Sequence, residues 1–170
     1  MVTINRILCP IDLSEASERT LDMALSLAEE AFGRVTLLHV VEGVLGESGP
    51  ELYRPVPETA RLRSELVDRA KEQLQRAAQR AHGFCAVTER VEAGSAWRQI
   101  LRVAEESYAD LIVMGVHAQG AVGRLFFGST ANQVVRHASC PVLSVRELRK
   151  AARSADGVLA ETANVAGFRP

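Results

Sequence analysis

The feature that most constrains the fold is a regular alternation of short β-rich segments with longer helical patterns. Residues 34–41, RVTLLHVV, form a continuous apolar run of the kind that is buried on both faces of a parallel sheet. Similar segments occupy 3–9, 84–93, 109–116 and 141–146. Because strands that alternate with helices form parallel sheets with helices on both faces, the sequence predicts a single α/β domain.

The helices are identified by apolar residues at helical spacing. They are expected at 15–32, 58–82, 94–108 and 128–138, with Gly33 ending the first. The second carries a stripe that is expected to be buried, made of Leu62, Leu66, Val67, Ala70, Leu74, Ala77, Ala78 and Ala81. Residues 42–59 are rich in glycine and proline and are expected to form a loop, and 147–170 a C-terminal tail that is flexible or forms a short helix.

Composition argues against several classes of protein. The 20 basic and 21 acidic residues give a net charge of −1 and are interleaved, whereas a nucleic-acid binder usually concentrates positive charge on one face. No apolar stretch approaches the roughly 20 residues that span a bilayer, and the N-terminus does not resemble a signal peptide. The three widely separated cysteines favour neither a disulfide framework nor a zinc site. These features predict a cytoplasmic protein that binds neither nucleic acid nor membrane.

Two segments follow strands that we expect to be neighbours. Asp12 comes just after the first strand, and the glycine-rich stretch 115–130 follows the fourth. In a sheet of order 3-2-1-4-5 these strands lie side by side where the strand order reverses, and ligands bind at such points, outside the carboxyl ends of the strands. The sequence therefore predicts one crevice between the two segments.

The residues of this crevice suit a nucleotide. Free N–H groups at the start of the last helix favour an anion, and hydroxyl groups there add donors. Asp12 can accept hydrogen bonds from ribose hydroxyls or from the amino group of adenine. The candidate phosphate contacts are Gly115, His117, Arg124, Gly128, Ser129 and Thr130.

Each of these residues also has an ordinary structural interpretation. The glycines can be turn residues, Asp12 a cap or turn residue, and Ser129 a plain helix cap. Neither a P-loop nor a G-x-S-x-G nucleophile motif is present, and the first strand is not followed by a glycine-rich turn. His39 is more simply a hydrogen-bonded residue at a strand end than a base. The residues alone leave nucleotide binding and a plain connection equally open.

Three segments together resemble the universal stress protein family. They are ILCPIDLSEASERTLDMALSLA, VTLLHVV and DLIVMGVHAQGAVGRLFFGSTANQVVRHASCPVLSVR, in that order, and the resemblance covers about 1–146. It implies a flavodoxin-like fold of the adenine nucleotide alpha hydrolase type, with a five-stranded parallel sheet of order 3-2-1-4-5. It also implies a homodimer paired through the last strand.

The nucleotide-binding branch of this family has the motif G-x2-G-x9-G-[ST]. Gly115 matches its first glycine, Gly128 its third and Ser129 its hydroxyl residue, but Ala118 stands where the second glycine is expected. If this position needs a left-handed backbone, alanine costs about 1–2 kcal/mol. That free energy corresponds to a roughly tenfold loss of affinity and not to its abolition.

The resemblance also assigns the adenosine end of the site. Asp12 matches the acidic residue after the first strand, and Val40 matches the position beside the base. Pro10, Ile11 and Met114 match the lining around it. The implied ligand is ATP, with Mg²⁺ as the ion accompanying its phosphates, although the sequence offers no dedicated pair of carboxylates for a metal.

The last strand, CPVLSVR, is apolar for an edge strand. Val142, Leu143 and Val145 would be exposed in a monomer, and exposed apolar edges tend to pair. We therefore expect these residues to form the homodimer interface.

These features lead to one main hypothesis and two alternatives. The main hypothesis is a stress-response protein that binds an adenine nucleotide and acts as a dimeric regulator. The second is a dimeric protein-interaction module of the same family that binds no nucleotide. The third is a true ATPase or phosphotransferase, which is disfavoured because the sequence shows neither a Walker lysine nor a general base, so that any hydrolysis should be slow.

Overall fold

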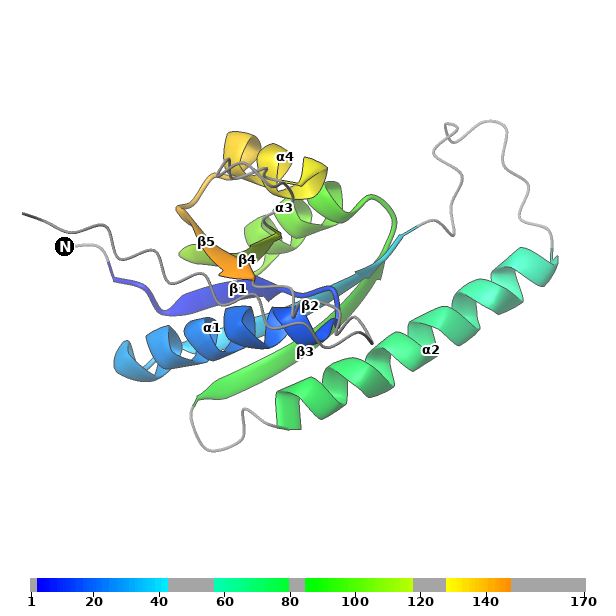
Figure 1. The fold of residues 1–170 in the computed structure, drawn as a ribbon, viewed down its shortest axis with the longest axis horizontal. Helices are drawn as coiled ribbons and strands as arrows, with labels where there is room; N and C mark the ends of the chain where they lie inside the picture. Colours follow the sequence, from blue (N-terminus) through cyan, green and yellow to red (C-terminus); the bar gives the residue numbers. More distant parts are fainter. Residues whose placement is uncertain (1–2, 43–56, 80–84, 118–127, 148–170) are drawn as a thin grey trace, which may run out of the picture.

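The computed structural model describes residues 3–42, 57–79, 85–117 and 128–147. Within these residues, five strands form one parallel sheet (Figure 1). The strands are β1 (Arg6–Pro10), β2 (Arg34–Val41), β3 (Ala86–Ala93), β4 (Leu111–His117) and β5 (Val142–Glu147). Their order in the sheet is β3-β2-β1-β4-β5, which confirms the predicted flavodoxin-like α/β fold.

The helices cover both faces of this sheet. They are α1 (Glu18–Glu30), α2 (Pro57–Gln79), α3 (Ala96–Glu106) and α4 (Ser129–His137). The first predicted helix is shorter than expected, because residues Glu15–Ser17 form a separate 3-10 turn, η1, before α1. Figure 1 shows α1 and α2 on one side of the sheet and α3 and α4 on the other.

The central strand β1 is buried on both faces. Ile7 and Cys9 pack into the core beneath α1 and α2, whereas Leu8 between them packs into the core beneath α3 and α4. Cys9 is therefore a small buried core residue. Burial also raises the pKa of the Cys85 and Cys140 thiols, which keeps them in the protonated form.

The turn after α1 differs from the prediction. Gly33 was expected to end the helix, but Phe32 takes the left-handed position instead, with φ 51°. The N–H of Phe32 donates to Glu29 O and that of Gly33 donates to Ala28 O, which is the Schellman pattern. Gly33 is needed for a different reason: a Cβ there would lie 2.6 Å from Asn5 O.

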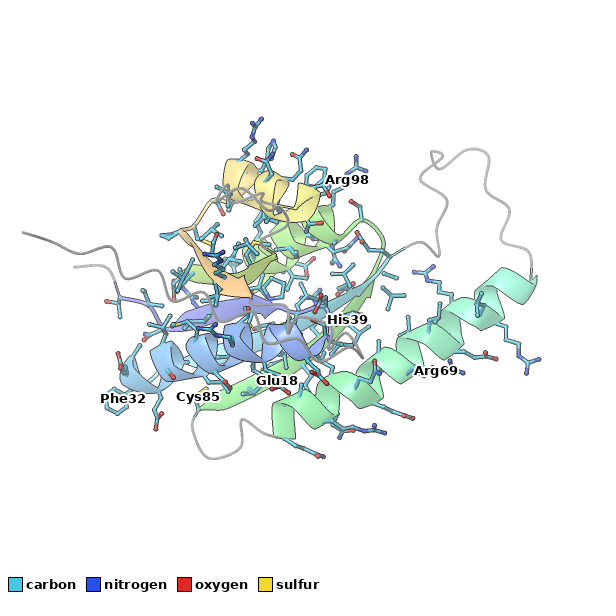
Figure 2. All side chains as sticks on the ribbon, viewed as in Figure 1. Glu18, Phe32, His39, Arg69, Cys85 and Arg98 are labelled. Carbon is cyan, nitrogen blue, oxygen red and sulfur yellow. The ribbon has the colours of Figure 1, made fainter. Side chains whose placement is uncertain are left out.

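The turn after α3 is built in the same way. Tyr108 has φ 51°, its N–H donates to Glu105 O, and the N–H of Ala109 donates to Ala104 O. Both aromatic side chains are exposed, Phe32 by 98% and Tyr108 by 73%. Figure 2 shows Phe32 beyond the end of α1, pointing away from the sheet.

Asp110 fastens β1 to β4 at the amino-terminal edge of the sheet. Its Oδ2 accepts the backbone N–H groups of Asn5 at 3.0 Å and Arg6 at 2.9 Å, and its Oδ1 accepts the Arg6 guanidinium at 3.0 Å. The hydrogen bond from Arg6 lowers the pKa of Asp110 below its usual value of 3.8.

The apolar stripe of α2 is only partly buried. Ala70, Leu74 and Ala78 pack against the sheet as predicted, but Leu66 and Val67 are half-buried and Leu62 is 54% exposed. The first turns of α2 project beyond the ends of the strands (Figure 1). The prediction that Leu62 is buried is therefore wrong, because a helix of 23 residues is longer than the strands that it covers.

The strand β5 forms one edge of the sheet. Leu143 is 37% exposed, whereas Val142 and Val145 are half-buried and pack against the cores on opposite faces. Of the three residues predicted at a dimer interface, Leu143 is thus the most accessible.

Candidate functional site

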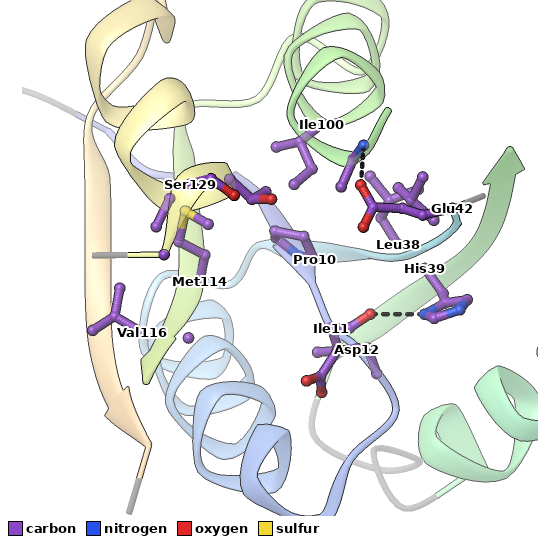
Figure 3. A pocket seen from close by; sticks show the side chains of 16 residues that line it. Pro10, Ile11, Asp12, Leu38, His39, Glu42, Ile100, Met114, Val116 and Ser129 are labelled. Carbon is purple, nitrogen blue, oxygen red and sulfur yellow. Dashed lines mark hydrogen bonds between the residues drawn. The ribbon is translucent and has the colours of Figure 1, made fainter. Parts of the chain in front are cut away.

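A cavity of about 290 Å³ opens at the carboxyl ends of the strands, where β1 and β4 diverge (Figure 3). It lies at the point where the strand order reverses, which is the usual ligand position in open α/β sheets. The residues that line it are Pro10, Ile11, Asp12, Leu38, His39, Val40, Glu42, Ala96, Ile100, Met114, Gly115, Val116, Gly128, Ser129, Thr130 and Ala131.

The end of β1 contributes one wall. The N–H of Ile11 donates to Leu38 O at 2.8 Å, which continues the sheet pairing for one residue beyond β1. Asp12 Oδ1 then accepts the N–H of Ser14 at 2.9 Å, and Leu13 between them has φ 62°. Asp12 therefore stabilises the turn, as its ordinary interpretation required, while its exposed side chain also lines the cavity.

The start of α4 contributes the opposite wall. The N-cap is Gly128 rather than Ser129, which is the first helical residue. Among the described residues, the first N–H of this helix that reaches a backbone carbonyl is that of Asn132, which donates to Gly128 O at 3.0 Å. Within this part of the chain the N–H groups that precede it meet no backbone carbonyl, which suits an anion, and the helix dipole favours negative charge at this end.

Gly128 leaves open space above this helix start. Its φ of −54° and ψ of 159° are accessible to any residue, so the backbone conformation does not require glycine. A Cβ built at this position would meet no atom of the described residues within 4 Å. The ordinary interpretation of Gly128 as a turn residue therefore loses its main support, and a close approach by a ligand becomes a reason for glycine here.

The end of β2 contributes polar groups that the sequence analysis did not assign to the site. His39 Nδ1 lies 2.9 Å from Ile11 O, so this histidine is hydrogen-bonded as expected and also holds the β1 wall in place. Glu42 Oε1 accepts the N–H of Ala96 at 2.9 Å, at the start of α3. Glu42 could have been identified from the sequence as an acidic residue that directly follows a strand next to the reversal point.

The structure brings together nine of the twelve residues predicted for the site. They are Pro10, Ile11, Asp12, Val40, Met114, Gly115, Gly128, Ser129 and Thr130. His117 ends β4, but its side chain is not among the described parts, and Ala118 and Arg124 also lie outside the described residues. The further lining residues, such as Leu38, Ile100 and Val116, are apolar and carry no pattern that distinguishes them from core residues.

The charges of the lining are unevenly distributed. Asp12 and Glu42 are acidic, and the described part of the lining contains no lysine or arginine. An anion would therefore be held there chiefly by backbone N–H groups and the hydroxyls of Ser129 and Thr130. Across the described ranges, no group of three or more His, Cys, Asp or Glu side chains is placed to hold a metal ion.

Comparison with known proteins gives the family. A model of the universal stress protein family matches residues 3–146, and the chain therefore belongs to this family. A universal stress protein of Methanocaldococcus jannaschii is 32% identical over 148 residues, which cover 85% of this chain and 84% of that protein.

Solved structures agree with the fold. Universal stress protein UspA from Lactobacillus plantarum superposes with a TM-score of 0.67 at 25% identity, covering 86% of this chain and 100% of that one. A universal stress protein in complex with cAMP superposes with a TM-score of 0.64 at 23% identity, covering 86% and 99% of the two chains. Among the helices that the structure describes, none is both long and apolar enough to cross a bilayer.

Proposed function

We propose that this protein binds an adenine nucleotide, ATP, in the cavity between β1, β2, β4 and α4, and acts in the cytoplasm as a dimeric, nucleotide-dependent regulator of a stress response. The observation that carries the proposal is the N-terminus of α4, where no described atom lies within 4 Å of a Cβ at Gly128 although its conformation does not require glycine. The structural neighbour with bound cAMP shares the fold and is consistent with this proposal.

The cavity has distinct ends for the parts of a nucleotide. The phosphates would lie against Gly128, Ser129 and Thr130, where N–H and hydroxyl donors meet. Asp12 lies on the β1 wall and would accept hydrogen bonds from the ribose. The base would lie against Val40 and its apolar neighbours, because a purine buries a large apolar face.

The remaining contacts of the phosphates would come from the end of β4. Gly115 lines the cavity without a side chain to block the approach, and Met114 beside it is buried. His117 and Ala118 follow and would lie near the phosphates. Mg²⁺ would come as the partner of the phosphates, and the carboxylates of the described lining are those of Asp12 and Glu42.

A second function is a dimeric protein-interaction module without nucleotide. The observation that favours it is the exposed Leu143 on the edge strand β5, since an apolar edge is suited to pairing with a second copy. Nucleotide binding and pairing are compatible, so the alternative applies only if the cavity binds nothing. Hydrolysis, if it occurs, should be slow, because the described lining offers no base poised over the phosphate end.

The proposal is tested by measuring the nucleotide content of freshly purified protein and by titrating ATP in a calorimeter. Inorganic triphosphate serves as the control, because it separates general anion binding at α4 from recognition of a nucleotide. We expect bound adenine nucleotide or saturable ATP binding that is much tighter than that of triphosphate. If no nucleotide co-purifies and no heat is released at millimolar ATP, the proposal is wrong and the interaction module is favoured.

A further inference from the structure

Glu42 is held in a defined position at one end of the cavity. It directly follows β2, and its Oε1 accepts the N–H of Ala96, the first residue of α3, at 2.9 Å. The positive end of a helix dipole stabilises a carboxylate at this place. Figure 3 shows this side chain reaching from the end of β2 toward the cavity, with the hydrogen bond on its far side.

Among the described residues, the second carboxylate oxygen of Glu42 has no hydrogen-bond partner. Within the described residues, the hydrogen bond to Ala96 is the only polar contact of this side chain. Glu42 itself is exposed, and the lining that it shares includes the apolar side chains of Leu38, Val40 and Ile100. A carboxylate acceptor next to apolar side chains suits a flat, apolar group that carries a hydrogen-bond donor.

The geometry also indicates which part of a nucleotide meets Glu42. In Figure 3, Pro10 lies between Ser129 on one side of the cavity and Glu42 on the other. With phosphates at the α4 start and the ribose near Asp12, the base would lie on the side of Glu42. The exocyclic amino group of adenine is a donor of the kind that a carboxylate accepts, whereas an unsubstituted purine offers none at this position.

We propose that Glu42 is a specificity-determining residue, which selects a 6-amino purine by accepting its exocyclic N–H at the end of the cavity opposite α4. This inference rests on the proposed nucleotide binding and adds the chemical basis of its base selectivity. Replacing the carboxylate by an amide presents a donor to the base, because the amide oxygen remains on the N–H of Ala96.

The test compares ATP with purine riboside triphosphate, which lacks only the amino group, by calorimetric titration. We expect the unchanged protein to bind ATP about tenfold more tightly, as for loss of a hydrogen bond to a charged group. In Glu42→Gln the two affinities should agree within about twofold. The matched control is Glu105→Gln on the exposed part of α3, which removes the same charge outside the cavity and should keep the tenfold difference.

The outcomes distinguish the inference from the proposal beneath it. If the unchanged protein binds ATP but does not distinguish the two purines, the inference is overturned and the proposed function stands, whether or not the variant folds. If Glu42→Gln instead changes the ratio of the affinities for ATP and 2′-deoxy-ATP, the carboxylate holds the ribose and the inference is again wrong. If ATP itself does not bind, both are overturned.

Discussion

The sharpest test of the phosphate end of the site is Gly128→Ala. In the protein alone, the added methyl group meets no atom of the described segments within 4 Å, and the φ of −54° and ψ of 159° suit alanine. In a complex, the same methyl group would occupy the space above the N–H groups that open α4. The substitution should therefore affect binding while leaving the free protein nearly unchanged.

The size of each effect can be worked out. A hydrogen bond to a charged group contributes about 1.5–3 kcal/mol, so displacing a phosphate from one N–H raises Kd roughly ten- to hundredfold. For folding, the smaller conformational entropy of the unfolded chain with alanine stabilises the protein by about 0.4–1 kcal/mol, and the poorer N-cap costs about 0.5–1 kcal/mol. The net change in the free energy of unfolding is thus within about 1 kcal/mol, or roughly 3 °C in Tm.

The assay combines an ATP titration with thermal unfolding in the absence of nucleotide, and Gly33→Ala is the control. A Cβ at Gly33 would lie 2.6 Å from Asn5 O, which is backbone and cannot move aside, so this variant should lose about 1–3 kcal/mol of stability. Its remaining folded protein should bind ATP normally. Unchanged ATP affinity in Gly128→Ala would refute the argument that this glycine leaves room for a phosphate.

Three further predictions concern stability and assembly. Phe32→Gly should raise the free energy of unfolding by about 0.5–1 kcal/mol in urea, because the left-handed φ of 51° suits glycine and the lost side chain is 98% exposed. Tyr108→Gly should raise the free energy of unfolding by less, because it also removes the contact of the Tyr108 ring with the Arg6 guanidinium, which lies 5.8 Å from the ring centre. Because its pKa is lowered in the folded protein, Asp110 contributes stability that is complete above its usual value of 3.8 and is lost as the pH falls through the lowered value. When urea unfolding is measured at about pH 5 and pH 3, the free energy of unfolding should therefore fall less between the two in Asp110→Asn than in the unchanged protein. Leu143→Glu should convert dimers to monomers on size-exclusion chromatography; a single size shared with the unchanged protein would argue against pairing through β5.

The order of strands and helices could be predicted because the hydrophobic pattern changes with each element. The residues at which the helices end could be predicted less well from this pattern. Glycine is the usual left-handed residue after a helix, so Gly33 was the natural choice, yet the left-handed residue is Phe32. Gly33 is required by the close approach of Asn5 O, a contact between segments far apart in the sequence that no local pattern reports.

The hydrophobic pattern likewise did not show how much of α2 is buried. Helical spacing shows which side of a helix is apolar, but not how far along its length a sheet extends beneath it. Leu74 and Leu62 belong to the same stripe, and only Leu74 lies over the strands. The same limitation applies to the cavity, because Ile100 and Leu38 have the spacing of core residues and line the cavity only through tertiary placement.

Asp12 shows why the choice of variant matters at this site. The sequence suggested either a turn residue or a ligand contact, and the structure gives it the first role without removing the second. Asp12→Ala would remove the acceptor for the N–H of Ser14 beside the left-handed Leu13, so lost ATP binding would have two explanations. Asp12→Asn keeps an oxygen for that N–H and removes only the charge. Gly128 and Glu42 are better probes still, since at Gly128 an added Cβ meets no described atom within 4 Å and at Glu42 an amide oxygen can keep the hydrogen bond from Ala96.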